Sequence, residues 1–181
     1  GEENLCLSGS LFENATLLSK INKLSPFKRI FVSAFMGDAG TCLGSALYTY
    51  YQYNSNKLLC NGSYSPFLGR KYTQQDIKTA LMDYDAEYEY VGSYPEKKLA
   101  KLLEHGNLIG IFNGRSEFGR TSLGSRCIVG NPNFLLNKVR LNKIKNRKME
   151  SSFGAFILDK NKLGIDKKDL SSPYFVNTCY L

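Results

Sequence analysis

The sequence predicts an α/β protein built in two parts, and three observations support this. Short apolar runs alternate with helix-period segments along the first 55 residues. Residues 54–69 are rich in Asn, Ser, Gly and Pro, which is typical of a linker. Helix-start signals then resume at residue 73. The composition, 43% hydrophobic and 22% charged, is ordinary for a globular protein, and 181 residues allow one domain or two small ones.

The first part shows a strand–helix–strand–helix order. We expect a strand over 4–9, an amphipathic helix over 15–24, a strand over 27–35 and a helix over 41–54. Two units of this kind favour a parallel or mixed sheet.

The second part begins with a helix whose start carries a capping box, Thr73 followed by Asp76. A second helix is expected to start at Ser93, to end at Gly106 and to carry His105 as a C-terminal cap. The expected elements are helices over 73–84, 95–106 and 133–146, the last basic and amphipathic, and strands over 86–93, 107–112, 127–132 and 153–158.

The net charge of +8 is unevenly distributed. No Asp or Glu lies between Phe118 and Met149, whereas eight basic residues do. This stretch is either a solvated basic face or an anion site for phosphates or nucleic acid. The basic residues are Arg120, Arg126, Lys138, Arg140, Lys143, Lys145, Arg147 and Lys148.

Cysteine usage and hydropathy indicate a cytoplasmic location. The five cysteines are scattered and lack metal-site spacing, which favours inert thiols in a reducing compartment. The N-terminus lacks the basic region of a signal peptide. No apolar stretch approaches the roughly 18 residues of a membrane span, so we expect no membrane association.

Two groups of polar residues follow expected strands. Asp38, in the turn from Met36 to Gly40, is predicted to be a helix cap or a ligand to metal or phosphate, and Asn14 either caps a helix or faces the same site. In the segment GRSEFGRTSLGSR, residues 114–126, an Arg fork matches carboxylate or phosphate geometry. Glu117 either orients Arg115 or contacts amide donors of a ligand, and the alternative is a weak surface salt bridge.

Several segments together resemble the NodU-type O-carbamoyltransferases along nearly the whole chain: NLCLSGSLFEN, IFVSAFMGDAGTCLGSALY, SPFLGRKYT, GIFNGRSEFGRTSLGSRCIVGNP and NKIKNR. The resemblance covers the latter part of a family member. It implies that residues 1–56 end an actin/sugar-kinase-like transfer domain. Residues 57–69 would be a linker, and 70–181 a YrdC-like α/β domain with a mixed twisted sheet.

The resemblance also implies roles for individual residues. Those of the YrdC-like domain would bind ATP and carbamoyl phosphate, and those of the first part would form the transfer site. Thr121 and Ser151 stand where the family pattern has arginine, so phosphate binding is weakened unless Arg120 or Lys148 compensates. The catalytic candidates are Arg115, Glu117 and Arg126; the nucleotide- or phosphate-binding candidates are Arg120, Lys145, Arg147, Gly9, Asn14, Gly37 and Gly40; the metal-ligand candidate is Asp38.

The resemblance implies an enzyme that makes carbamoyladenylate from ATP and carbamoyl phosphate. The carbamoyl group would pass to a hydroxyl of a sugar, glycan or natural product. Mg²⁺ would accompany ATP, and a divalent metal such as Fe²⁺ would bind Asp38 if an N-terminal half or partner subunit supplies histidines. The alternative is a catalytically impaired module that binds nucleotide or nucleic acid, although nucleic acid is the less favoured partner.

Overall fold

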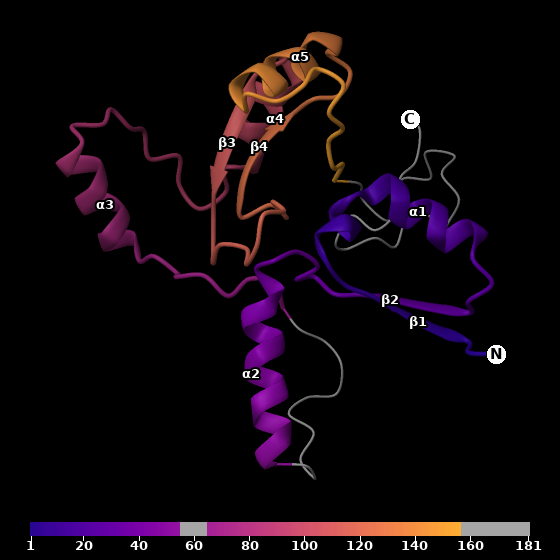
Figure 1. Cartoon of the computed structure of the whole chain (residues 1–181). Helices are drawn as coiled ribbons and strands as arrows, with labels where there is room; N and C mark the ends of the chain where they lie inside the picture. Colours follow the sequence, from indigo (N-terminus) through magenta and orange to yellow (C-terminus); the bar gives the residue numbers. More distant parts are fainter. Residues whose placement is uncertain (55–64, 157–181) are drawn as a thin grey trace. The chain divides into compact units, whose positions relative to one another are not determined.

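A computed structural model describes residues 1–54 and 65–156 of the chain (Figure 1). The chain divides into two compact units, which are described separately below. Of the described residues, unit 1 comprises 1–54, 65–67, 118–121 and 154–156, and unit 2 comprises Leu68–Glu117 and Ser122–Phe153. Both units mix helices with a small sheet, which confirms the α/β class.

In unit 1, two parallel strands are joined through a helix. Strand β1 pairs with β2 in a register that runs from Asn4 opposite Arg29 to Leu7 opposite Val32. The parallel pair agrees with the parallel or mixed sheet predicted from the strand–helix–strand order. The elements are β1 (Asn4–Leu7), a 3₁₀ helix η1 (Ser10–Glu13), α1 (Ala15–Leu24), β2 (Arg29–Val32) and α2 (Gly40–Tyr53).

The core of unit 1 forms where α1 covers one face of this sheet. Leu18 of α1 is 2% exposed and packs with Leu7 and Met36, the latter from the loop after β2. Side chains alternate along both strands between covered and exposed faces, as expected for a sheet with one side packed. The partly buried residues around this core are Leu5, Phe12, Ile21, Ile30 and Val32.

Unit 2 is built around an antiparallel pair of strands. Strand β3 pairs with β4, with Leu108 opposite Gly130 and Phe112 opposite Arg126. Helix α4 lies against β3 (Figure 1). The elements are α3 (Gln74–Asp83), α4 (Glu96–Glu104), β3 (Leu108–Phe112), β4 (Arg126–Gly130) and α5 (Leu135–Ile144).

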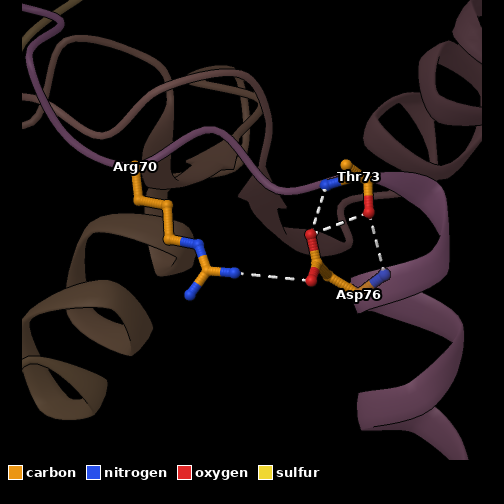
Figure 2. Close-up of polar contacts among 3 residues, drawn as sticks. All are labelled: Arg70, Thr73 and Asp76. Atoms are coloured by element: carbon orange, nitrogen blue, oxygen red, sulfur yellow. Dashed lines mark hydrogen bonds and ion pairs between the residues drawn. The ribbon is translucent and has the colours of Figure 1, made fainter.

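The predicted capping signals hold at two helix ends. The Thr73 hydroxyl accepts the Asp76 N–H, and the Asp76 carboxylate accepts the Thr73 N–H at 2.8 Å, which forms the capping box of α3 (Figure 2). His105 ends α4, and its Nδ1 lies 2.6 Å from the Lys101 carbonyl oxygen. The predicted start at Ser93 is wrong, because Pro95 occupies the N-cap position of α4 without a side-chain cap.

The strand predicted over 86–93 does not form in the part of the chain that the structure describes. Its alternating tyrosines and acids satisfy the period of a strand, but none of the described strands pairs with it. Tyr88 and Tyr90 are exposed, and Glu89 forms an ion pair with Lys98 of α4. Of the strand predicted over 153–158, residues 153–156 are irregular and the last two lie outside the described residues.

Helix α5 does not bury the apolar face that its sequence suggested. Its buried side chains are Asn137, Leu141 and Asn142, whereas Leu135 and Leu136 are exposed. The physical reason is that loop carbonyl groups lie on its inner side. The Asn137 amide donates to the Asn131 carbonyl oxygen, so this side requires polar side chains.

No helix among residues 1–54 and 65–156 is long and apolar enough to cross a membrane.

Candidate functional site

The long loop between β3 and β4, residues 113–125, is organised around Glu117. Oxygen Oε1 of Glu117 accepts the backbone N–H groups of Leu123 and Ser125, both at 2.7 Å. The N–H of Arg126 makes a third, longer contact of 3.4 Å. The second half of the loop is therefore held by hydrogen bonds to a single carboxylate oxygen. Gly114 and Gly124 adopt φ angles of 56° and 113°, which other residues rarely reach.

The hydrogen bonds also set the ionisation of Glu117. Partial burial by itself would raise the pKa of this carboxyl, but the backbone N–H groups of Glu117, Ser125, Leu123 and Arg126 lower it more, so the pKa lies below its ordinary value of 4.5. The group is a carboxylate at neutral pH. The expectation that it orients Arg115 is not met in this structure, because its contacts are with the backbone.

Arg126 fastens the two ends of the same loop. Its guanidinium carbon lies 3.5 Å from the centre of the Phe112 ring, the residue opposite it across the strand pair. Its Nη1 donates to the carbonyl oxygens of Asn113 and Ser125 at 2.8 and 2.9 Å, and its Nη2 donates to that of Gly114 at 3.1 Å. Arg126 thus uses much of its donor capacity on the protein and shapes the turn that carries Arg115.

Arg115 is exposed at the tip of this turn. Its Nη1 donates to the Gly69 carbonyl oxygen at 2.9 Å, which leaves other donors of the fork directed to solvent or ligand. Lys145, directly after α5, is also exposed. These two cations are the candidates of unit 2 best able to meet an anion.

Arg147 holds the turn after α5. Its Nε donates to the Asn142 side-chain oxygen at 3.1 Å, its Nη2 donates to the Ser152 carbonyl oxygen at 3.3 Å, and it stacks 4.5 Å from the centre of the Phe153 ring. Asn142 is fully buried, and its amide donates to the Met149 carbonyl oxygen at 3.0 Å. Sequence reasoning missed Asn142, since a lone Asn in a helix gives no signal of such a role.

Cys127 follows Arg126 on β4 and is partly buried. Loss of solvation raises the pKa of its thiol, and the nearby negative charge of Glu117 raises it further. The Ser122 hydrogen bond and the charge of Lys145 oppose this shift only in part. The thiol therefore stays protonated, which makes it a poor nucleophile.

In unit 1, the two strand-end loops that the sequence singled out lie side by side. The Gly9 N–H donates to the Met36 carbonyl oxygen at 2.7 Å. Asn14 is the N-cap of α1, and its side-chain oxygen accepts the N–H groups of Thr16 and Leu17. A Cβ atom on Gly40 would lie 2.0 Å from the Phe35 carbonyl oxygen, so this position requires glycine.

Asp38 lies exposed in the second of these loops. The alternative that its side chain caps α2 is wrong, since Ala39 takes the N-cap position and only the Asp38 carbonyl contacts the helix, at Thr41. Arg120 is exposed and lies 3.8 Å from Glu13. A Cβ atom on Gly37 would meet the Glu13 carboxylate. Within the described residues, no group of three or more His, Cys, Asp or Glu could hold a metal ion, so Asp38 alone does not fit one.

Comparisons with known proteins match both ends of the chain to one family. Residues 1–47 match the family model for the carbamoyltransferase N-terminus, and residues 100–181 match that for the carbamoyltransferase C-terminus. An uncharacterized protein of Synechocystis sp. is 33% identical over 97% of this chain. Nodulation protein NolNO of Sinorhizobium fredii and nodulation protein NolO of Bradyrhizobium diazoefficiens are each 30% identical over 89% of it.

The chain spans only part of these relatives: 30% of the Synechocystis protein, 24% of NolNO and 30% of NolO. The matches to both family models and to nodulation proteins agree with the motifs around Gly9, Gly40 and Arg115. The chain therefore belongs to the NodU-type carbamoyltransferase family.

Proposed function

We propose that this chain is the C-terminal portion of an ATP-dependent O-carbamoyltransferase. Unit 2 forms carbamoyladenylate from ATP and carbamoyl phosphate, and the carbamoyl group then passes to a hydroxyl of a sugar, glycan or natural product. Family membership supports carbamoyl transfer. The observation that carries the proposal is the loop held by Glu117 and Arg126, which presents Arg115 to solvent.

The proposed reaction balances as three successive displacements. Water takes the phosphoryl group of carbamoyl phosphate, which releases inorganic phosphate and carbamate. A carbamate oxygen then attacks the α-phosphorus of ATP, and pyrophosphate leaves. The acceptor hydroxyl finally attacks the carbamoyl carbon, gives up its proton, and AMP leaves. The charge on the phosphates is large throughout, so positioning and electrostatic stabilisation dominate the contribution of the protein.

The side chains of unit 2 divide into two roles under this proposal. Arg115 and Lys145 are exposed cations that bind phosphate oxygens. Glu117, Arg126 and Arg147 hold the two segments that carry them, through contacts with backbone carbonyl and N–H groups and with Asn142. Arg120 is exposed, and we propose that it too binds phosphate.

Residues 1–56 are proposed to be the end of an actin-like transfer domain, and residues 70–181 a YrdC-like domain. The loops from Gly9 to Asn14 and from Gly37 to Gly40 are proposed to contribute to the transfer site. Since the described residues do not form a metal site, a metal at Asp38 would need ligands from an N-terminal half or partner subunit. We propose a cytoplasmic location because ATP and carbamoyl phosphate are cytoplasmic substrates.

Calorimetric titration with ATP and Mg²⁺, with and without carbamoyl phosphate, tests the proposal. We expect ATP binding that carbamoyl phosphate strengthens, followed by equal release of phosphate and pyrophosphate. Arg115→Ala should weaken ATP binding by about tenfold to a hundredfold or more, as the loss of charge-assisted hydrogen bonds implies. Lys138→Ala, which removes another exposed positive charge, from α5, is the matched control. Unchanged ATP affinity in Arg115→Ala would contradict the assignment.

A further inference from the structure

Two segments of unit 2 that lie far apart in sequence are joined at Gly69. Its N–H donates to the Ser116 carbonyl oxygen at 3.0 Å, and its own carbonyl oxygen accepts from Arg115 at 2.9 Å. A Cβ atom on Gly69 would lie 1.7 Å from the Ser116 Oγ, so the absence of a side chain permits this approach. Residues 69–72 are therefore held beside the turn that presents Arg115.

The neighbours of Gly69 extend this contact as a row of guanidinium and aromatic groups. The Arg70 guanidinium lies 4.9 Å from the centre of the Tyr72 ring, and Tyr72 lies 5.5 Å from Phe112. Arg126 covers Phe112 at 3.5 Å. Stacking on an aromatic face limits the positions that a guanidinium can take and leaves its N–H edges open. Three arginines, Arg70, Arg115 and Arg126, are thus gathered from two segments of the chain.

Arg70 is an exposed member of this group. Its side chain is 69% exposed, and its Nη2 lies 3.4 Å from Oδ1 of Asp76 (Figure 2). The other oxygen, Oδ2, accepts from the Thr73 N–H and hydroxyl, so Asp76 is fixed by the start of α3. An exposed pair at this distance is weak and is screened by salt. A phosphate group can replace Asp76 as the partner of Arg70.

We propose that Arg70 binds the polyphosphate of the nucleotide together with Arg115, with Asp76 as the internal competitor for the Arg70 fork. This inference rests on the proposed function and adds a binding residue to it. Family arginines are replaced at Thr121 and Ser151, and Arg70 supplies positive charge next to the Arg115 turn. The segment LGRKYT, residues 68–73, is then a binding element as well as the lead into α3.

The test compares three variants of the 181-residue chain by calorimetry, with ATP and inorganic tripolyphosphate as probes. Arg70→Ala should weaken the affinity for both by about tenfold or more, the loss expected for a charge-assisted hydrogen bond. Lys71→Ala removes the same charge from the next exposed residue and should change affinity by no more than about twofold. Asp76→Asn keeps an oxygen for the capping box but removes the competing charge, so it should tighten binding.

The outcomes separate this inference from the proposed function. If the wild-type chain binds ATP and Arg70→Ala behaves like Lys71→Ala, the role of Arg70 is wrong and the proposed function stands. If tripolyphosphate binds through Arg70 but ATP does not, the anion site is supported and the nucleotide function is overturned. Failure of the wild-type chain to bind either probe would overturn both.

Discussion

The hydrogen bonds of Glu117 predict how much the loss of its charge would destabilise the loop between β3 and β4. Glu117→Gln keeps an oxygen acceptor but removes the charge that strengthens the two 2.7 Å hydrogen bonds from Leu123 and Ser125. A hydrogen bond to a charged group contributes about 1.5–3 kcal/mol, against about 0.5–1.5 kcal/mol for a neutral one. Two bonds would therefore lose about 2–3 kcal/mol, and partial solvation of the loop reduces this to about 1–2 kcal/mol.

Amide hydrogen exchange measures this loss at the two residues concerned. A change of about 1–2 kcal/mol in local opening corresponds to roughly 5- to 30-fold faster exchange at Leu123 and Ser125. Amides of α1, in unit 1, should keep their rates. The matched control is Glu104→Gln, which removes an exposed carboxylate from α4. Equal protection of Leu123 and Ser125 in the wild type and in Glu117→Gln would refute the reasoning.

The lowered pKa of Glu117 predicts how the difference in loop stability between the wild type and Glu117→Gln depends on pH. Burial alone would raise the Glu117 pKa, but the backbone N–H groups outweigh it, so the folded pKa lies below the ordinary 4.5. The stabilisation is therefore complete above the unfolded pKa and is lost as pH falls through the folded pKa. The difference in protection factors between wild type and Glu117→Gln should hold from pH 7 to about 5 and disappear in stronger acid. A difference that grows on acidification would contradict this assignment.

Two further predictions concern stability and use urea unfolding followed by circular dichroism. Gly40→Ala should lower the free energy of unfolding by about 1–3 kcal/mol, because the new Cβ would meet the Phe35 carbonyl oxygen. Gly44→Ala, in open space on the same helix, should not lower it. Equal effects of the two substitutions would refute the close approach at Gly40. Asn142→Ala should lower the free energy of unfolding by about 1–3 kcal/mol, since it removes the partner of the Arg147 Nε and of the Met149 carbonyl oxygen. Lys143→Ala, the control, should leave the free energy of unfolding nearly unchanged. A nearly unchanged value for Asn142→Ala would show that water replaces these contacts.

The parts of the fold predicted correctly depend on neighbours in sequence. Helix α1 has the predicted bounds, since Asn14 caps its first turn and Leu18 and Ile21 recur on one face. The Thr73–Asp76 capping box likewise spans only three residues. The parallel pairing of β1 and β2 follows from their order with α1 between them. Local chemistry determines each of these features, so the sequence alone was sufficient.

The parts that could not be predicted depend on how loops fold back on neighbouring elements, which residue periodicity does not encode. Residues 86–93 alternate as a strand does, but pairing needs a neighbouring strand that periodicity cannot supply. The buried asparagines of α5 donate hydrogen bonds to carbonyl groups of the loops that flank this helix. At the candidate site, the residue types near Arg115 predicted an anion-binding segment. Only the structure shows which groups Glu117 and Arg126 contact and how closely Gly69 approaches the Arg115 turn.

The protonated, partly buried Cys127 gives the chain an internal chemical reporter. We expect its thiol to react slowly with alkylating reagents, because partial burial and the charge of Glu117 raise its pKa and the thiolate that attacks them is scarce. Any ligand that tightens the loop slows alkylation of the Cys127 peptide further, and any change that loosens it accelerates labelling. Mass spectrometry of that one peptide over the course of alkylation, with and without ATP and carbamoyl phosphate, would follow the site without an engineered cysteine.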